Sequence, residues 1–414
     1  MLNPLLSPSS SSLEQRIQEM LRSVRLHLGM DVGFVSEFRN GSRFFNYVDA
    51  SSPDSPVILG GSNPLEQSFC HFVATGALPE LMQDAADVPL AAAMPVTKAL
   101  PVGAHVSAPI RLDDGSVYGT FCCFSNKSDH SLNHRDLAML KVFADLTGKL
   151  IQADLRAKRE HTDIRARIEQ IIQERQLSIV YQPLYRLSDD SLVGFEALSR
   201  FSTQPLRSPD QWFAEAAQVG LGVELEFLAV QDACTALLTL APTLLLAINL
   251  SPHSILSPSF NTHFAEFPVH RLILEVTEHA AIESYAEIER SLAPLRQRGL
   301  RLAVDDAGAG HASFKHVLVL RPDLIKLDMS LTRNIHCDPA RRALAEALTR
   351  FGRAMGSEIV AEGVETEFEL EALREIGVTK AQGYLLGRPM SLNAAAAVPA
   401  FLAERGARKL VSRA

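Results

Sequence analysis

Two adjacent carboxylates, Asp305 and Asp306, follow an apolar run at residues 301–304 and precede a loop that contains Gly308 and Gly310. Successive side chains of a strand point to opposite faces. At the end of a strand, where the chain turns, both carboxylates can face one site. Their like charges repel, and a cation lying between them would relieve that repulsion. The pair therefore indicates either a turn, because Asp and Gly favour turns, or part of a metal site.

Similar arrangements recur along the C-terminal half of the chain. Four other apolar runs lead into a residue that can bind a metal ion: Glu196, Asn249, Glu275 and Glu362. Two further runs place Lys326 and Gln382. The strand-like runs alternate with helix-like segments from Leu177 to about Arg405, close to the ~250 residues typical of a (β/α)8 barrel. Oxygen ligands at the C-terminal ends of successive parallel strands predict one shared site at the top of such a barrel.

Composition limits the class of protein. The chain has 414 residues, enough for two or three domains, with 47% hydrophobic and 21% charged residues, as in ordinary globular proteins. Its net charge of −8 argues against binding of DNA or RNA polymers. A phosphate substrate remains possible, because divalent cations can supply positive charge.

Cysteine use and hydropathy bear on the compartment. The five cysteines are odd in number and form no CxxC pair, which indicates neither a disulfide framework nor a zinc site and suits a reducing cytoplasm. The N-terminus lacks the pattern of a signal peptide. The most apolar run, residues 237–250, is too short to span a membrane. We expect a cytoplasmic protein that does not associate with membranes.

The N-terminal third predicts one α+β domain. Residues 1–12 are rich in Ser and Pro, which predicts a disordered N-terminus. The following elements are expected: a helix over 13–28, a strand over 31–38, a hairpin turn at Asn40-Gly41, a second hairpin around Asp113-Asp114-Gly115, and a helix over 134–156.

Residues 13–155 resemble a GAF domain. The features that carry the resemblance include the strand at 32–38, Ser68-Phe69-Cys70 before a short helix, and the run at 102–110 that leads into the second hairpin. The resemblance implies a sensory or dimerising module that can hold a small ligand of unknown identity.

Three cysteines of this domain could belong to a binding site. Cys70 beside His71 could form a redox or cofactor site, but we interpret Cys70 as a half-buried residue at a helix start and His71 as a surface residue. Cys122 and Cys123 are neighbours on one strand, so at most one of them lines a pocket.

Residues 137–175 predict a long helical linker. Apolar residues recur there at three- and four-residue steps, with an interruption near His161. This stripe favours a coiled-coil seam and hence a homodimer, although a helix packed on its own domain would show the same spacing. We expect the N-terminal domain to regulate the C-terminal domain through this helix.

Residues 176–407 resemble an EAL domain, whose name is spelled by Glu196-Ala197-Leu198. The resemblance rests on an ordered set of motifs: Tyr181-Gln182-Pro183, Glu196 to Arg200, Asn249-Leu250-Ser251, Glu275-Val276-Thr277-Glu278, Asp305-Asp306, Lys326-Leu327-Asp328, Glu362-Gly363-Val364-Glu365, Gln382-Gly383-Tyr384 and Gly387-Arg388-Pro389. It implies a phosphodiesterase that hydrolyses cyclic di-GMP to linear pGpG with Mg²⁺ or Mn²⁺.

The resemblance also implies residue roles. One divalent ion would be held by Glu196, Asn249, Glu275, Asp305 and Glu362, and a second by Asp305 with Asp306. The catalytic residues would be Glu362, Lys326 and Asp306, with Glu362 acting either as general base or chiefly as a metal ligand. The dinucleotide would be bound by Gln182, Arg200, Glu365, Gln382 and Pro389. Glu278 would anchor the loop that follows the paired aspartates.

The sequence departs from the family pattern at three positions. Ala307 and His311 stand where the family usually has Phe and a Tyr-like residue, and Phe201 stands where it often has Trp. The first two changes lie in the loop that shapes metal binding. They keep open an alternative, in which the chain is a catalytically silent cyclic di-GMP receptor that acts through a protein partner.

Overall fold

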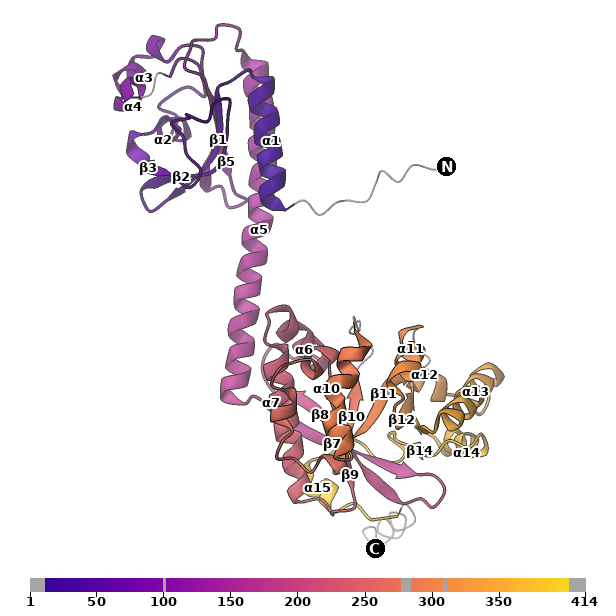
Figure 1. Ribbon diagram of the computed structural model, residues 1–414. Helices are drawn as coiled ribbons and strands as arrows, with labels where there is room; N and C mark the ends of the chain where they lie inside the picture. The colour runs from indigo at the N-terminus through magenta and orange to yellow at the C-terminus, as the bar shows by residue number, and fades with distance from the viewer. Residues whose placement is uncertain (1–11, 100–101, 277–283, 308–310, 402–414) are drawn as a thin grey trace, which may run out of the picture. The chain divides into compact units, whose positions relative to one another are not determined.

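The computed structural model describes residues 12–99, 102–276, 284–307 and 311–401. The segment 1–11, predicted to be disordered, and residues 402–414 lie outside this part. The chain forms two compact units, residues 1–160 and 161–414 (Figure 1). Among the described residues, no helix combines the length and apolar character needed to cross a membrane.

The N-terminal unit is an α+β domain around a six-stranded antiparallel sheet, in the order β3-β2-β1-β6-β5-β4. Its elements are α1 (Leu13–His27), β1 (Val32–Arg39), β2 (Ser42–Ala50), β3 (Ser62–Pro64), α2 (Phe69–Ala74), β4 (Leu81–Met82), α3 (Pro89–Ala93), α4 (Pro95–Ala99), β5 (His105–Arg111), β6 (Val117–Phe124) and the start of α5 (His134–Glu174). The predicted turn at Asn40-Gly41 is confirmed: both residues have positive φ, as a two-residue hairpin turn requires.

The two faces of this sheet pack against different elements. Cys123 belongs to the core formed with α1 and α5, whereas Cys122 belongs to a cluster on the other face with Phe34 and Cys70. The prediction that at most one of the two neighbouring cysteines lines a pocket is confirmed, because Cys122 lines a cavity of this domain and Cys123 does not. Cys70 is fully buried rather than half-buried, because α2 packs it against β5 and β6.

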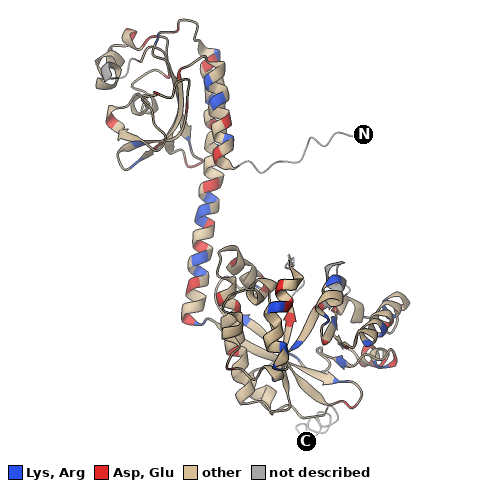
Figure 2. Cartoon of the chain, in the orientation of Figure 1, with Lys and Arg blue, Asp and Glu red and all other residues tan. Residues whose placement is uncertain are grey.

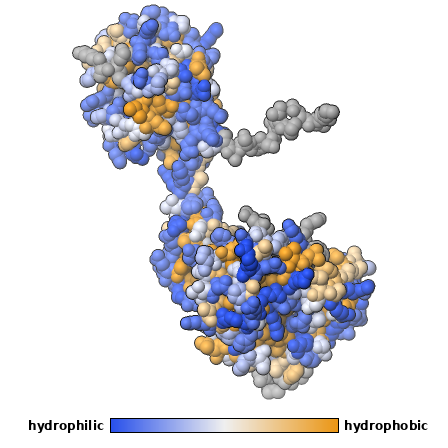
Figure 3. Space-filling view, in the orientation of Figure 1, coloured by the Kyte–Doolittle hydropathy of each residue, from blue (hydrophilic) through white to orange (hydrophobic). Residues whose placement is uncertain are grey.

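Helix α5 is continuous over 41 residues and has no break near His161. Leu140, Ala144 and Ile151 pack in the core of the N-terminal unit. Ile164, Ile168 and Ile171 pack in a separate cluster that contains Trp212. Lys and Arg alternate with Asp and Glu along the middle of the helix, where the surface is mostly hydrophilic (Figures 2 and 3).

The C-terminal unit is a closed eight-stranded barrel, in the order β10-β11-β12-β13-β14-β7-β8-β9. Its elements are β7 (Leu177–Arg186), β8 (Leu192–Phe201), α6 (Pro209–Gln218), α7 (Gly222–Cys234), β9 (Leu245–Leu250), α8 (Pro252–Ile255), α9 (Phe260–His263), β10 (Leu272–Val276), α10 (Tyr285–Gln297), β11 (Arg301–Ala307), α11 (His311–Leu320), β12 (Leu324–Leu327), α12 (Met329–Thr332), α13 (Pro339–Met355), β13 (Glu358–Ala361), α14 (Glu367–Glu375), β14 (Lys380–Ala381) and α15 (Leu392–Ala396). The predicted barrel class is confirmed.

One strand differs from the expected all-parallel arrangement. β7 runs antiparallel to both of its neighbours, β8 and β14, while β8 to β14 are parallel. The reason is local: only a short turn containing Asp189 and Asp190 joins β7 to β8, and a parallel crossover needs a dozen or more residues.

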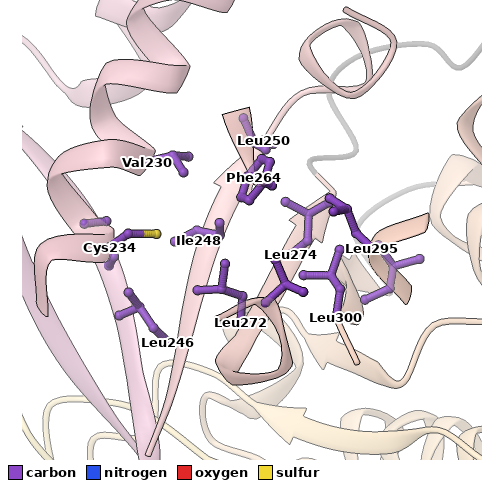
Figure 4. Packing of buried hydrophobic residues seen from close by; sticks show 14 of the residues in the cluster. Val230, Cys234, Leu246, Ile248, Leu250, Phe264, Leu272, Leu274, Leu295 and Leu300 are labelled. Atoms are coloured by element: carbon purple, nitrogen blue, oxygen red, sulfur yellow. The ribbon is translucent and has the colours of Figure 1, made fainter. Parts of the chain in front are cut away.

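Because successive side chains of a strand point to opposite faces, the apolar side chains of the barrel strands form two sets, one outside the barrel and one inside it. Leu246, Ile248, Leu272 and Leu274 point outward and pack against residues of the surrounding helices, such as Leu295 (Figure 4). A smaller cluster fills the barrel interior: Leu184, Val193, Leu245, Ala247, Ile273, Ala303, Leu324 and Val360. These interior residues support the polar site described next.

Candidate active site

Strand alternation brings the predicted site residues to one place. Five of them stand two positions after an interior residue of the barrel, so the pleat directs them to the same side of the wall. The pairs are Ala247 and Asn249, Ile273 and Glu275, Ala303 and Asp305, Leu324 and Lys326, and Val360 and Glu362. The site therefore continues the interior stack toward the C-terminal ends of the parallel strands.

The ammonium group of Lys326 lies at the centre of the site. Its Nζ is 2.7 Å from Glu275 Oε2, 2.7 Å from Glu362 Oε1, 3.2 Å from Asp305 Oδ1 and 3.6 Å from Glu196 Oε1. Lys326 is 2% exposed and Glu275 is 4% exposed, so these charges interact away from bulk water. A buried cation of this kind is stable only because carboxylates surround it.

Burial and the crowding of charges shift the pKa values of these groups. For Glu275, burial together with the neighbouring carboxylates raises the pKa well above its usual value, despite Lys326. For Glu362, burial, with Asp305 and Glu196 nearby, raises the pKa to about 8 against the opposing charge of Lys326. Burial would lower the pKa of Lys326, but the four carboxylates together raise it well above its usual value. Four carboxylates thus share one fixed positive charge.

Two amide side chains connect the carboxylates. Gln382 Nε2 donates to Glu196 Oε2 at 2.6 Å and to Glu362 Oε1 at 3.0 Å, and Asn249 Nδ2 donates to Glu196 Oε1 at 3.3 Å. For Glu196, burial raises the pKa, but the charge of Lys326 and these hydrogen bonds outweigh it, so the net shift is downward. Glu196 is therefore held as a charged carboxylate.

The paired aspartates lie in an irregular part of β11. Val304 pairs with Ile325 and Ala307 pairs with Leu327, so Asp305 and Asp306 together face the single residue Lys326. Two residues opposite one is a β-bulge, which breaks the strict alternation of a strand. The side chains of Asp306, Ala307 and His311, and all of Glu278, lie outside the described part of the chain.

The donor set suits a divalent metal ion. Four carboxylate oxygens from β8, β10, β11 and the end of β13 surround one point, and Asn249 adds an amide. Hard oxygen donors favour Mg²⁺ or Mn²⁺ over metals that prefer thiolates. Among the described residues no three acidic, His or Cys side chains are grouped closely enough to hold a metal ion. The Lys326 ammonium lies between the carboxylates. It acts as a stand-in cation there.

The predicted substrate-binding residues lie around this centre at different depths. Gln182 is buried in β7 opposite Glu196, and its Nε2 donates to the carbonyl of Gly387 at 3.2 Å. This contact holds the segment with the half-buried Pro389 beside β7. Arg200 is exposed, with Nη1 donating to the Ser199 carbonyl. Among the described residues no ion pair or hydrogen bond joins Gln182, Arg200 or Pro389 to the carboxylates around Lys326, whereas Gln382 is bonded to two of them.

Glu365 is tied to a residue that sequence analysis did not single out. Its Oε1 lies 2.6 Å from Arg333 Nη2, and both side chains are partly exposed. A second overlooked residue is Glu226 on α7, whose Oε2 accepts hydrogen bonds from the Ser251 backbone N–H and hydroxyl. Ser251 was part of a recognised motif, but nothing in the sequence indicates its distant partner.

Comparisons with known proteins identify both units. A family model for the EAL domain matches residues 165–389, and one for the GAF domain matches residues 12–151. The chain therefore belongs to the EAL domain family, and a GAF domain forms its N-terminal unit. Both assignments agree with the resemblances seen in the sequence.

Among individual relatives, the chain is 30% identical over 231 residues to the probable cyclic di-GMP phosphodiesterase PdeD of Escherichia coli, covering 53% of this chain and 43% of PdeD. It spans between 29% and 43% of the length of this relative and of two uncharacterized proteins from Caulobacter vibrioides and Sinorhizobium fredii.

Two solved structures extend the comparison. The PaMucR phosphodiesterase in complex with c-di-GMP is 29% identical, with a TM-score of 0.50 over 55% of this chain and 98% of that one. The EAL enzyme Bd1971, with cAMP and cyclic di-GMP bound, covers 89% of this chain and 93% of its own, with a TM-score of 0.56. At 16% identity, that likeness shows the fold alone.

Proposed function

We propose that this chain hydrolyses cyclic di-GMP to linear pGpG with the help of two divalent metal ions, Mg²⁺ or Mn²⁺. The observation that carries the proposal is the set of four carboxylates around Lys326 at the mouth of an EAL-family barrel. Relatives named as cyclic di-GMP phosphodiesterases support the choice of substrate.

The metal ligands would be Glu196, Asn249, Glu275, Asp305 and Glu362, with Asp305 and Asp306 holding the second ion. Divalent ions held by these residues would lower the pKa of a bound water and stabilise negative charge on the phosphate oxygens. Every other contribution comes from side chains of the chain itself.

Lys326 would keep positive charge beside the phosphate and orient the attacking water, because its Nζ is fixed from several sides. Glu362 is assigned as a metal ligand or general base. Its Oε1 accepts from both Lys326 and Gln382, so a proton from water would go to Oε2. Gln182, Arg200, Glu365, Gln382 and Pro389 would bind the dinucleotide, with Arg200 donating to a phosphate or a guanine edge. Glu278 would anchor the loop after Asp306.

The first test is chromatographic. Purified full-length protein is incubated with cyclic di-GMP and Mg²⁺ or Mn²⁺, and pGpG is quantified over time beside an EDTA control. Glu196→Gln should abolish turnover, because it removes a charged ligand but keeps the shape of the side chain. Glu287→Gln on α10, which is 55% exposed, is the matched control and should leave turnover unchanged.

Two outcomes would count against the enzyme. Turnover retained by Glu196→Gln would contradict the assignment of the site. Tight binding of cyclic di-GMP without any pGpG would move the chain to the class of silent receptors that act through a protein partner.

We also propose that the GAF domain regulates the phosphodiesterase through α5 and that the chain forms a homodimer. The support is that one uninterrupted helix contributes to both cores, and that Val142 and Leu146 on this helix are 56% and 43% exposed. The test compares full-length protein with residues 161–414. The shortened chain begins at His161, because Ile164, Ile168 and Ile171 belong to the cluster around Trp212. Equal turnover and equal oligomeric state would contradict both parts of this proposal.

A further inference from the structure

The GAF domain contains a cavity of about 310 Å³ with one polar end. Its walls are mainly aromatic and aliphatic: Phe34, Phe45, Val57, Phe69, Val102 and Phe124. Ile58 also lines it and is 69% exposed, so the cavity reaches the protein surface there. This volume lies at the small end of the range for ligand sites in proteins.

Arg43 provides the positive charge at the polar end. It is 6% exposed, and it lies over the rings of Phe34 and Phe45. Its Nε donates to Asn63 Oδ1 at 3.1 Å and its Nη1 to Cys70 Sγ at 2.9 Å. Within the described part of the chain no Asp or Glu comes within ion-pair distance of this guanidinium, which is unusual for a buried arginine.

His105 is the second polar group of the cavity. It is 3% exposed, its Nε2 lies 3.2 Å from Cys122 Sγ, and its Nδ1 is buried without a hydrogen-bond partner among the described residues. A buried polar atom left unpaired is costly, and His105 is one of the residues that line the cavity, so a ligand that reaches this ring would supply the missing partner.

The hydrogen bond to Cys70 partly compensates the burial of Arg43 in the free protein. Burial would raise the pKa of the Cys70 thiol, but the hydrogen bond with Cys122 and the charges of Arg43 and His105 hold it well below its usual value. The sulfur of Cys70 is a weaker hydrogen-bond acceptor than a carboxylate oxygen. Cys70 itself is fully buried and does not line the cavity, so it does not fill the polar end.

We propose that this cavity binds a small monocarboxylate with an aromatic or branched aliphatic body. The carboxylate would accept hydrogen bonds from Arg43 and His105, and the body would pack between Phe34, Phe69 and Phe124. Donors prevail at the polar end and the remaining walls are apolar, so the ligand must present acceptors at one end and hydrocarbon at the other. The proposal concerns binding alone and does not depend on the activity of the barrel.

The test is ligand-detected NMR on full-length protein with benzoate, phenylacetate and isovalerate as probes. Benzamide, which has the shape of benzoate without its charge, should bind at least about tenfold more weakly, because a hydrogen bond to a charged group is worth more than a neutral one. Arg43→Gln should weaken benzoate binding by about 10- to 150-fold and leave benzamide binding nearly unchanged. Arg39→Gln is the matched control, because Arg39 lies on the neighbouring strand over Phe44 and outside the cavity.

Arg43→Lys covers the case in which Arg43→Gln does not fold. It keeps the charge but loses the planar fork, so benzoate binding should fall by an intermediate factor. Three results would overturn the proposal: no binding of any of the three carboxylates at about 10 mM, equal affinity for benzoate and benzamide, or equal loss in Arg39→Gln and the Arg43 variants.

Discussion

Replacing Lys326 with Met tests whether this ammonium group neutralises the buried carboxylates of the barrel. Nζ lies 2.7 Å from oxygens of both Glu275 and Glu362 and 3.2 Å from Asp305. Met has a similar volume and no charge, so the variant leaves these carboxylates without their shared cation. Removing one partner of a buried ion pair costs about 3–5 kcal/mol. We expect a loss of this size in the free energy of unfolding when metal ions are absent.

Trp212 makes the measurement specific to the barrel unit. It is the only tryptophan of the chain, and it is fully buried in the cluster around α6 and α7. Unfolding by denaturant in EDTA, followed by Trp212 fluorescence, gives the loss directly. At about 2–4 °C per kcal/mol, the thermal midpoint should fall by roughly 6–20 °C. Lys315→Met is the control, because Lys315 is exposed and contacts only the ring of Tyr285 among described residues, so about 1 kcal/mol or less is expected.

The same variant tests metal binding. Mn²⁺ should recover part of the deficit of Lys326→Met, because a bound divalent ion would supply the missing positive charge and stabilise the folded state. The control should gain no more than the unmodified chain. If Lys326→Met were as stable as the unmodified chain in EDTA, the view of Lys326 as the neutralising cation would be refuted. A deficit that Mn²⁺ leaves unchanged would instead refute the metal site.

Three further predictions concern residues that support the barrel. Arg271→Met should lower the free energy of unfolding by about 2–5 kcal/mol, because Arg271 donates to four backbone carbonyls within residues 237–244. Turnover per folded molecule should not change. Trp212 fluorescence measures the stability, and pGpG formation measures the turnover. Gly194→Ala should reduce soluble yield strongly, because an added Cβ would lie 2.1 Å from the Leu245 carbonyl oxygen. Gly220→Ala should be far milder, because it has open space around it and adds only the strain of its positive φ, about 1–2 kcal/mol. Gln382→Leu should weaken Mn²⁺ binding by about 10- to 100-fold in calorimetry, because it frees two of the carboxylates.

The barrel site could be predicted because its residues follow the period of a strand. In β9, β10, β12 and β13 the apolar runs alternate between interior and exterior positions, and the polar residue comes next on the interior side. Each apolar run therefore predicts both the strand and the side of the strand to which its functional side chain points. Lys326 is the clearest case, since a lysine within Leu-Ile-Lys-Leu can be buried only beside carboxylates.

The direction of β7 could not be predicted in the same way. Residues 177–186 show a strand pattern, but period-two alternation is identical for parallel and antiparallel strands. The only signal is the short connection to β8, which lacks the length for a crossover helix. The bulge in β11 could not be predicted either, because the two aspartates face a single lysine only when β11 is paired with β12.

The barrel site and the GAF cavity each bury an unequal number of hydrogen-bond donors and acceptors, and the imbalance has the opposite sense in the two sites. Lys326 is one cation among four carboxylates, so acceptors are in excess and the site is suited to a further cation. Arg43 is a buried cation whose hydrogen-bond acceptors, among the described residues, are an amide oxygen and a sulfur, so donors are in excess and the site is suited to an anion. No motif in the sequence marks the second site, because Arg43, Cys70 and His105 come from three separate elements and meet only in the folded domain. The same accounting of buried donors and acceptors that supports the proposed metal site of the barrel therefore predicts the ligand charge of the GAF cavity.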